Sequence, residues 1–134
     1  MNLASYESAN EKLCISVMVT NDTAIISLKG VFSVHARHQF KSSYLFVMNK
    51  AGIKNIVVNL ASVTFMDSSA LGMLLELRQS AGVFNRIVFL SNPIEHVNKM
   101  LNIACFHKLF SIVKDVSPVQ QNVPAHSFSV HCEG

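Results

Sequence analysis

Residues 56–72 read IVVNLASVTFMDSSALG, and within this stretch an extended pattern changes to a helical one. The β-branched run in residues 53–60 is typical of a strand that is buried on both faces of a sheet. The residues after it indicate a short loop, and Asp67, Ser68 and Ser69 then begin a helix. This order places one carboxylate and two hydroxyl groups at a helix start.

The start of a helix favours negative charge, because the N–H groups of its first turn have no partner within the helix and carry a partial positive charge. A phosphate group on a serine is electrostatically tolerated there. Asp and Ser are also the residues that most often cap helices, so capping alone explains the same pattern. Spacing by itself does not separate a phosphorylation site from a cap.

The other patterns predict strands that alternate with helices after an initial hairpin. We expect the hairpin from residues 12–20 and 23–28, with a turn at Asn21 and Asp22. The elements expected after it are a helix over residues 34–51 closed by Gly52, a strand over 53–60, a helix over 68–81, a strand over 86–91, a helix from Asn92 and Pro93 to Ile103, and a strand over 110–113.

Helical spacing predicts which side chains face the core. In the first helix it selects Ala36, Phe40, Tyr44, Val47 and Met48. In the second helix it selects a stripe that consists of Leu71, Leu74, Leu75 and Arg78. Met73 and Leu77 lie off this stripe and are expected outside the core.

The fold class predicted from this order is α/β. We expect a single domain with a mixed sheet of four to five strands, an N-terminal hairpin and three to four helices. The domain is assigned to residues 1–116. Residues 117–134 are rich in Pro, Gln, Asn and His and are expected to form a flexible tail, in which Phe128 and Val130 could dock locally.

Composition excludes several classes of protein. The chain has 134 residues, of which 50% are apolar and 14% charged, and its basic residues are scattered, which argues against nucleic-acid binding. Neither a secretion signal nor an apolar run of about 18 residues is visible, so no membrane segment is predicted. Cys14, Cys105 and Cys132 are far apart and odd in number, which favours a reducing cytoplasm over a disulfide framework.

Other candidate chemistry has little support. His35 and His38 share a helix face, but no third ligand follows at useful spacing, so neither a metal nor another cofactor is predicted. Ser68 lacks a Gly-x-Ser-x-Gly elbow and obvious His and acid partners, which argues against a serine hydrolase. The chain has no glycine-rich phosphate loop, which argues against an NTPase. We therefore do not expect an enzyme.

The segments Ile56–Leu60 and Phe65–Gly72 resemble the STAS domain of bacterial anti-sigma factor antagonists. The resemblance extends from about Leu13 to Val116 and includes Gly30, Leu90–Pro93 and Met100–Ile103. It implies a partner-switching regulator that binds an anti-sigma factor, which is also a serine kinase of the GHKL ATPase type, and that is released when phosphorylated. A PP2C-type phosphatase would reset the switch.

The resemblance also implies site residues. The serine directly after the motif aspartate is Ser68, which is the expected phosphorylation site, and its neighbour Ser69 is the second candidate. Ala70 stands where the family usually has glycine, and Ser33 stands where it often has aspartate. The predicted partner-binding surface combines the helix start with the loop after the second strand and consists of Phe32, Ser33, Asp67, Ser68, Ser69, Gly72 and Met73.

Two other hypotheses remain open. The same domain could act without phosphorylation, as an adaptor subunit of a transport or signalling complex. In that role it would resemble the STAS domains that are attached to transporters or lipid-transport complexes. A small hydrolase with Ser68 as its nucleophile would need an aligned base and an oxyanion site.

Overall fold

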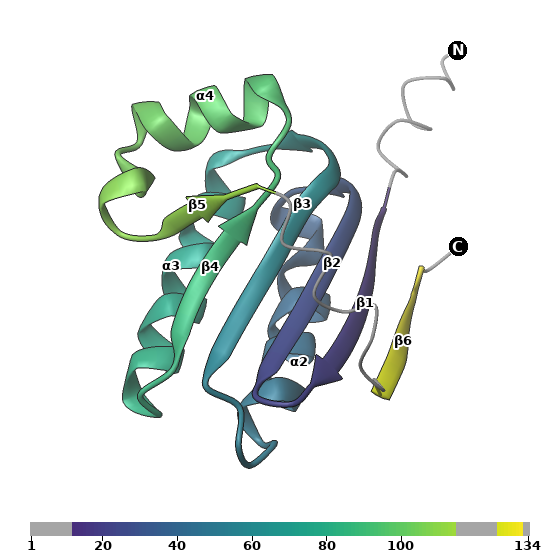
Figure 1. Ribbon diagram of the computed structural model, residues 1–134. Helices are drawn as coiled ribbons and strands as arrows, with labels where there is room; N and C mark the ends of the chain where they lie inside the picture. The colour runs from purple at the N-terminus through teal and green to yellow at the C-terminus, as the bar shows by residue number, and fades with distance from the viewer. Residues whose placement is uncertain (1–11, 115–125, 133–134) are drawn as a thin grey trace.

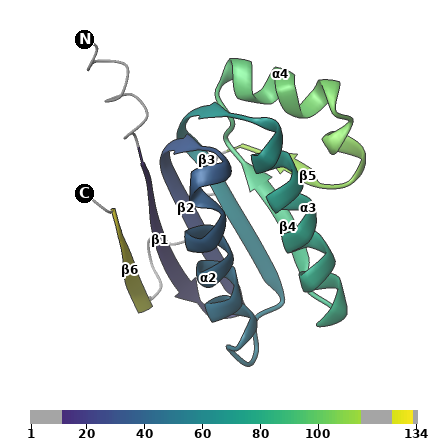
Figure 2. The same ribbon diagram turned by 180° about the vertical axis from the view of Figure 1, so that it is seen from behind.

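The computed structural model describes residues 12–114 in full and the backbone of residues 126–132. The strands form one mixed sheet in the order β5-β4-β3-β2-β1-β6. Helices α2 and α3 lie over the same face of the sheet, whereas the face toward the viewer in Figure 1 carries no helix among the described residues (Figures 1 and 2). The predicted class, an α/β domain with a mixed sheet and an N-terminal hairpin, is confirmed.

The hairpin consists of β1 (Leu13–Thr20) and β2 (Thr23–Phe32), which pair in antiparallel register. The turn contains Asn21 at φ +50°, a left-handed conformation that asparagine tolerates. Gly30 has φ +109°, and a Cβ atom there would lie 2.5 Å from the carbonyl oxygen of Lys12. The backbone directly before β1 therefore approaches β2 too closely for a residue with a side chain at this position.

Strand β3 (Asn55–Met66) is longer than predicted. The expected loop after Leu60 is wrong, because β3 continues to pair with β2 up to Phe32 and Met66. Two register shifts in this ladder, between Ser27 and Lys29 and between Gly30 and Val31, allow the longer strand to stay paired. The strand therefore ends directly before Asp67.

The other two parallel strands complete this side of the sheet. β4 (Ile87–Ser91) pairs with β3, and β5 (Ser111–Val113) pairs with Phe89–Ser91 of β4. β2, β3, β4 and β5 all run in the same direction, so their carboxyl ends meet at one edge, where α4 also lies (Figure 1).

Five helical segments lie within residues 12–114: η1 (Val34–Ala36), α2 (Arg37–Met48), α3 (Ser68–Val83), α4 (Glu95–Ile103) and η2 (Phe106–Lys108). The core side predicted for the first helix is confirmed, since its five selected residues are buried. Its predicted end at Gly52 is wrong, because α2 stops at Met48 and Gly52 lies in the following turn at φ +85°. No helix in the described part of the chain is long and apolar enough to cross a membrane.

The core side of α3 differs from the prediction. Leu74 is buried as expected, and Leu71 packs partly against the core, but Leu75 and Arg78 are exposed. The buried residues are Ala70, Met73, Leu74, Leu77 and Ala81. Apolar residues occupy more than one side of this helix, so periodicity alone selected a stripe rotated by about one residue, or about 100°.

The segment predicted as a tail contributes a sixth strand. β6 (His126–Cys132) pairs in antiparallel register with β1, and this register pairs Phe128 with Val17 and Val130 with Ile15. The sheet therefore has one strand more than the upper number expected. Residues 117–125 and 133–134 of the predicted tail lie outside the described residues.

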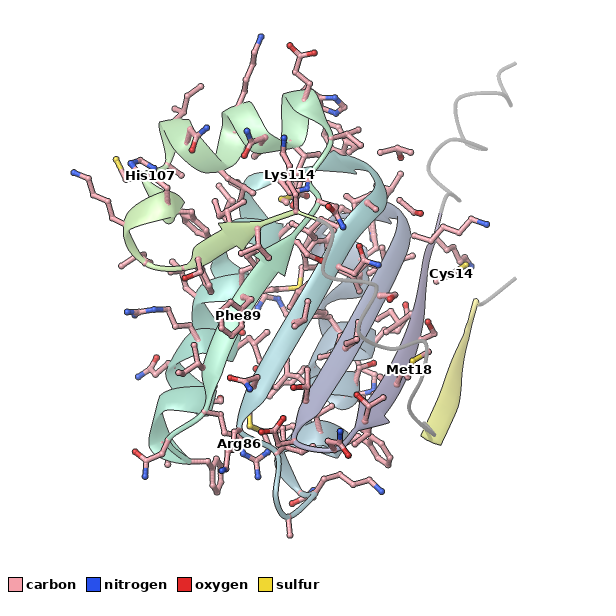
Figure 3. The ribbon with its side chains drawn as sticks, in the orientation of Figure 1. Cys14, Met18, Arg86, Phe89, His107 and Lys114 are labelled. Atoms are coloured by element: carbon pink, nitrogen blue, oxygen red, sulfur yellow. The ribbon has the colours of Figure 1, made fainter. Side chains whose placement is uncertain are left out.

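The cysteines also differ from expectation. Cys14 is disulfide-bonded, and the β1–β6 register places Cys132 directly opposite it. Figure 3 shows Cys14 near the start of β1, beside the end of β6. Cys105 is an exposed free thiol. The prediction failed because it judged the cysteines by their separation in sequence, whereas β6 returns the end of the chain to its first strand.

Candidate functional site at the start of α3

Asp67 joins two segments that are distant in sequence. It is the N-cap of α3, with extended backbone angles, and its Oδ1 accepts a hydrogen bond from the Ala70 N–H at 2.9 Å. Its Oδ2 accepts a hydrogen bond from the Val34 N–H at 3.2 Å. The carboxylate therefore satisfies one amide in the first turn of α3 and another at the start of η1.

Ser33 begins the neighbouring segment in a similar way. It is the N-cap of η1, and its Oγ accepts a hydrogen bond from the His35 N–H at 3.4 Å. The backbone N–H of Asp67 donates to the carbonyl oxygen of Phe32 at 3.3 Å, which holds the ends of β2 and β3 together. The structure thus brings Ser33 and the start of α3 together, at the edge where the parallel strands end.

Ser68 is the first residue of α3, and it is exposed. Ser69 is half-buried, and Ala70 is fully buried. The Ser68 hydroxyl is therefore accessible to another protein and lies at the positive end of a helix of 16 residues. Gly72, one turn further along, is half-buried, and a Cβ atom there would meet nothing within 4 Å.

Two residues of the predicted partner-binding surface lie in the core. Phe32 is 0% exposed, and its ring centroid lies 5.0 Å from that of Phe40. Met73 is 1% exposed, so the expectation that it lies off the core side of its helix is wrong. Both side chains support the site from beneath, because they face the sheet and the helix layer rather than solvent.

Two exposed apolar residues at this site were missed. Val34 is 47% exposed and Phe65 is 50% exposed, although each lies within two residues of a predicted site residue. The segment around Phe65 has buried residues at Leu60, Val63 and Met66, a spacing of three that neither a regular strand nor a helix predicts. The bulged register accounts for this spacing, so periodicity gave no signal for an outward-facing Phe65.

The carboxyl edge has a further contact beside Phe65. The His96 ring Nε2 lies 2.8 Å from the carbonyl oxygen of Thr64, which joins the first turn of α4 to the end of β3. His35 and His38 are both exposed. Among residues 12–114, no three His, Cys, Asp or Glu side chains are grouped so that they could hold a metal ion.

Comparisons with known proteins agree with this geometry. Residues 15–123 match the family model of the STAS domain. The chain is 40% identical over 87 residues to a STAS-domain containing protein of Pseudomonas aeruginosa (strain UCBPP-PA14), which covers 65% of this chain and 84% of that protein. It is 32% identical over 84 residues to an anti-sigma F factor antagonist of Lysinibacillus sphaericus, covering 62% of this chain and 71% of that protein.

The fold is similar to that of the anti-sigma factor antagonist SpoIIAA. Its unphosphorylated form matches with a TM-score of 0.67 and 23% identity, over 77% of this chain and 89% of that chain. The phosphorylated form of the Bacillus SpoIIAA matches with a TM-score of 0.62 and 22% identity, over 77% of this chain and 92% of that chain. Because the family model covers most of the sequence and two relatives agree with it, the chain belongs to the STAS domain family.

Proposed function

We propose that the protein is an anti-sigma factor antagonist that binds an anti-sigma factor with serine kinase activity of the GHKL type and is released when Ser68 is phosphorylated. The observation that carries the proposal is the exposed Ser68 hydroxyl, directly after the capping Asp67. Homology to an anti-sigma F factor antagonist supports it, as do the unphosphorylated and phosphorylated forms of SpoIIAA. A PP2C-type phosphatase reverses the modification, and the cycle takes place in the cytoplasm.

The proposed contact surface, here called the docking face, is the accessible part of the site. Val34 and Phe65 provide exposed apolar area within two residues of Ser33 and Asp67. Apolar side chains around a small polar centre are typical of a protein–protein interface, in which the centre loses its water on binding. The docking face consists of Ser33, Val34, Phe65, Asp67, Ser68, Ser69 and Gly72.

Phosphorylation changes the charge at the centre of the docking face. A phosphoserine carries about −1.5 to −2 charges at neutral pH. It would stand next to the Asp67 carboxylate, which two backbone N–H groups hold in place. Like-charge repulsion and the desolvation of the phosphate both oppose docking. A hundredfold loss of affinity requires only about 2.7 kcal/mol, which one unpaired charge at an interface can supply.

We expect the free antagonist to stay folded when it is phosphorylated. Ser68 is exposed, so the phosphate stays in water in the free protein. The start of α3 also favours negative charge, because its first-turn N–H groups and dipole are positive there. The proposed switch therefore acts on the complex and leaves the fold of the free chain unchanged.

Incubation with the anti-sigma factor kinase and ATP, followed by mapping of phosphate by mass spectrometry, tests the proposal. We expect phosphate on Ser68, its loss in Ser68→Ala and its retention in the matched control Ser69→Ala. An active kinase that leaves Ser68 unmodified would rule out the switch. If Ser68→Ala and Ser68→Asp both bind the partner like the unaltered protein, the domain acts instead as an unphosphorylated adaptor.

A further inference from the structure

A concave site lies beside the C-terminal half of α3. It is a cleft of about 540 Å³ between this helix, the start of β4 and residues 107–111. Ser68 does not line it, because the helix residues of the cleft are 78, 79 and 82. The cleft is therefore separate from the docking face, and a ligand bound in it would be independent of the proposed phosphorylation switch.

The cleft exists because β5 is short. β5 pairs only with Phe89–Ser91, so Ile87 and Val88 at the start of β4 have no strand beside them on this edge within the described residues. The space that a longer β5 would fill stays open. Its walls include exposed apolar area from Ile87 and Leu109, which a non-polar part of a ligand could cover.

The lining of the cleft is basic. It includes Arg78, Arg86 and Lys108 together with His107, and none of the described lining residues is Asp or Glu. Figure 3 shows Arg86 at the start of β4 and His107 near the end of α4. Positive charges that gather in a concave surface concentrate the potential and attract anions.

The two arginines are held in place by neutral acceptors. The Arg78 Nε donates to the Leu109 carbonyl oxygen at 2.9 Å, and this bond leaves both terminal nitrogens of its guanidinium for another acceptor. Arg86 donates to the carbonyl oxygens of Val47 at 2.9 Å and Lys50 at 2.8 Å. These bonds occupy both terminal nitrogens of Arg86 and direct them toward Val47 and Lys50, which do not line the cleft. Arg78 is therefore the guanidinium that offers donors to an anion in the cleft.

We propose that this cleft binds the phosphate group of a phosphorylated small molecule. The guanidinium of Arg78 presents the planar pair of donors that phosphate oxygens accept, with Lys108 as a second positive charge. Gln79 and Ser111 add neutral hydrogen-bonding side chains to the lining. The volume lies within the usual range of small-molecule sites, so the ligand has room for a group attached to the phosphate.

Titration of the full chain with inorganic phosphate and with pyrophosphate, at low ionic strength and followed by amide chemical shifts, tests this proposal. We expect saturable shifts at residues that line the cleft, including Gln79, Gly82 and Ser111. Arg78→Gln should weaken binding about tenfold, because it removes a charged hydrogen bond to the ligand. The matched control Arg37→Gln removes the same charge from α2 and should change affinity by less than about twofold.

A second variant keeps the test decisive if Arg78→Gln unfolds. Lys108 is exposed, and Lys108→Gln should also weaken binding while the spectrum of the folded protein is retained. The proposal is overturned if neither anion produces a saturable shift or if the shifts lie outside the cleft. Equal losses in Arg37→Gln and Arg78→Gln would likewise overturn it, since they would indicate attraction to the overall positive charge.

Discussion

The carboxylate of Asp67 accepts a hydrogen bond from the backbone N–H of Val34 at 3.2 Å, although 33 residues separate the two in sequence. The other carboxylate oxygen caps α3 through the Ala70 N–H. One side chain thus fixes the loop after β2 relative to the helix that carries Ser68. The docking face depends on this bond, because Ser33 and Val34 lie on one side of it and Ser68 on the other.

Replacement of Asp67 should therefore cost stability. Asp67→Ala removes both bonds and is expected to lower the free energy of unfolding by about 1–2 kcal/mol, the usual cost of a lost cap. Asp67→Asn keeps a capping oxygen but offers an amide group to one of the two N–H donors, so its loss should be smaller. Urea unfolding of the three proteins measures the difference. Equal stability of Asp67→Ala and the unaltered protein would show that neither bond matters.

Substitution of Gly72 should raise the stability of the protein but lower its affinity for the partner. A Cβ atom at Gly72 or at Gly82 would meet nothing within 4 Å, and both residues lie in α3. Alanine at either position should stabilise the helix, by up to about 1 kcal/mol. Gly72→Ala should also weaken binding of the anti-sigma factor, because its methyl group projects into the docking face. The control Gly82→Ala should bind normally, and equal affinities of the two variants would exclude Gly72 from the interface.

Deprotonation of the Tyr44 phenol should lower the free energy of unfolding at alkaline pH. Burial raises the pKa of the Tyr44 phenol above its ordinary value of 10.0, and the nearby charge of Glu76 raises this pKa further, against smaller opposing effects of Ser80 and Arg37. The folded protein therefore holds this proton more tightly than the unfolded chain does. Stability should then be lost as the pH rises through about 10, where the unfolded chain begins to release the proton.

The variant Tyr44→Phe isolates this effect from the titration of lysines. Urea unfolding at several pH values between about 8 and 11 should show a shallower alkaline loss in Tyr44→Phe than in the unaltered protein. Phenylalanine keeps the ring that packs 5.5 Å from Phe40, centroid to centroid, so the core is preserved. Parallel curves for the two proteins would mean that Tyr44 has the same pKa in both states.

The Cys14 disulfide should stabilise the oxidised protein. A bond that closes a long loop limits the conformations of the unfolded chain, and a disulfide typically contributes about 2–4 kcal/mol. Reduction, or the change Cys14→Ser, should therefore lower the thermal midpoint. Cys105→Ser is the matched control, because Cys105 is a free exposed thiol. If reductant leaves the unfolding curve of the Cys105→Ser protein unchanged, the disulfide contributes nothing.

Local patterns predicted the parts of this fold that local forces determine. The hairpin turn at Asn21 and the buried side of α2 follow from short-range rules, and the structure agrees with both. The capped start of α3 at Asp67 is another such feature. Each depends on residues within a few positions of one another, so one sequence was enough.

The features that were missed depend on long-range pairing. β3 continues to Met66 because bulges in its ladder with β2 keep it paired, and these bulges also turn Phe65 outward. The β1–β6 pairing brings Cys132 opposite Cys14 from the other end of the chain. The buried side of α3 was misjudged because its apolar residues allow two stripes, and only packing against the sheet selects the one that contains Met73.

The affinity of the anti-sigma factor for the protein with phosphoserine at position 68 tests the central claim most directly. Phosphoserine can be incorporated at this position, and binding can be compared by calorimetry with that of the unmodified protein and of Ser68→Ala. We predict that the unmodified protein and Ser68→Ala bind alike and that the phosphorylated protein binds at least about a hundredfold more weakly. Affinities within about twofold of one another for all three proteins would contradict the account.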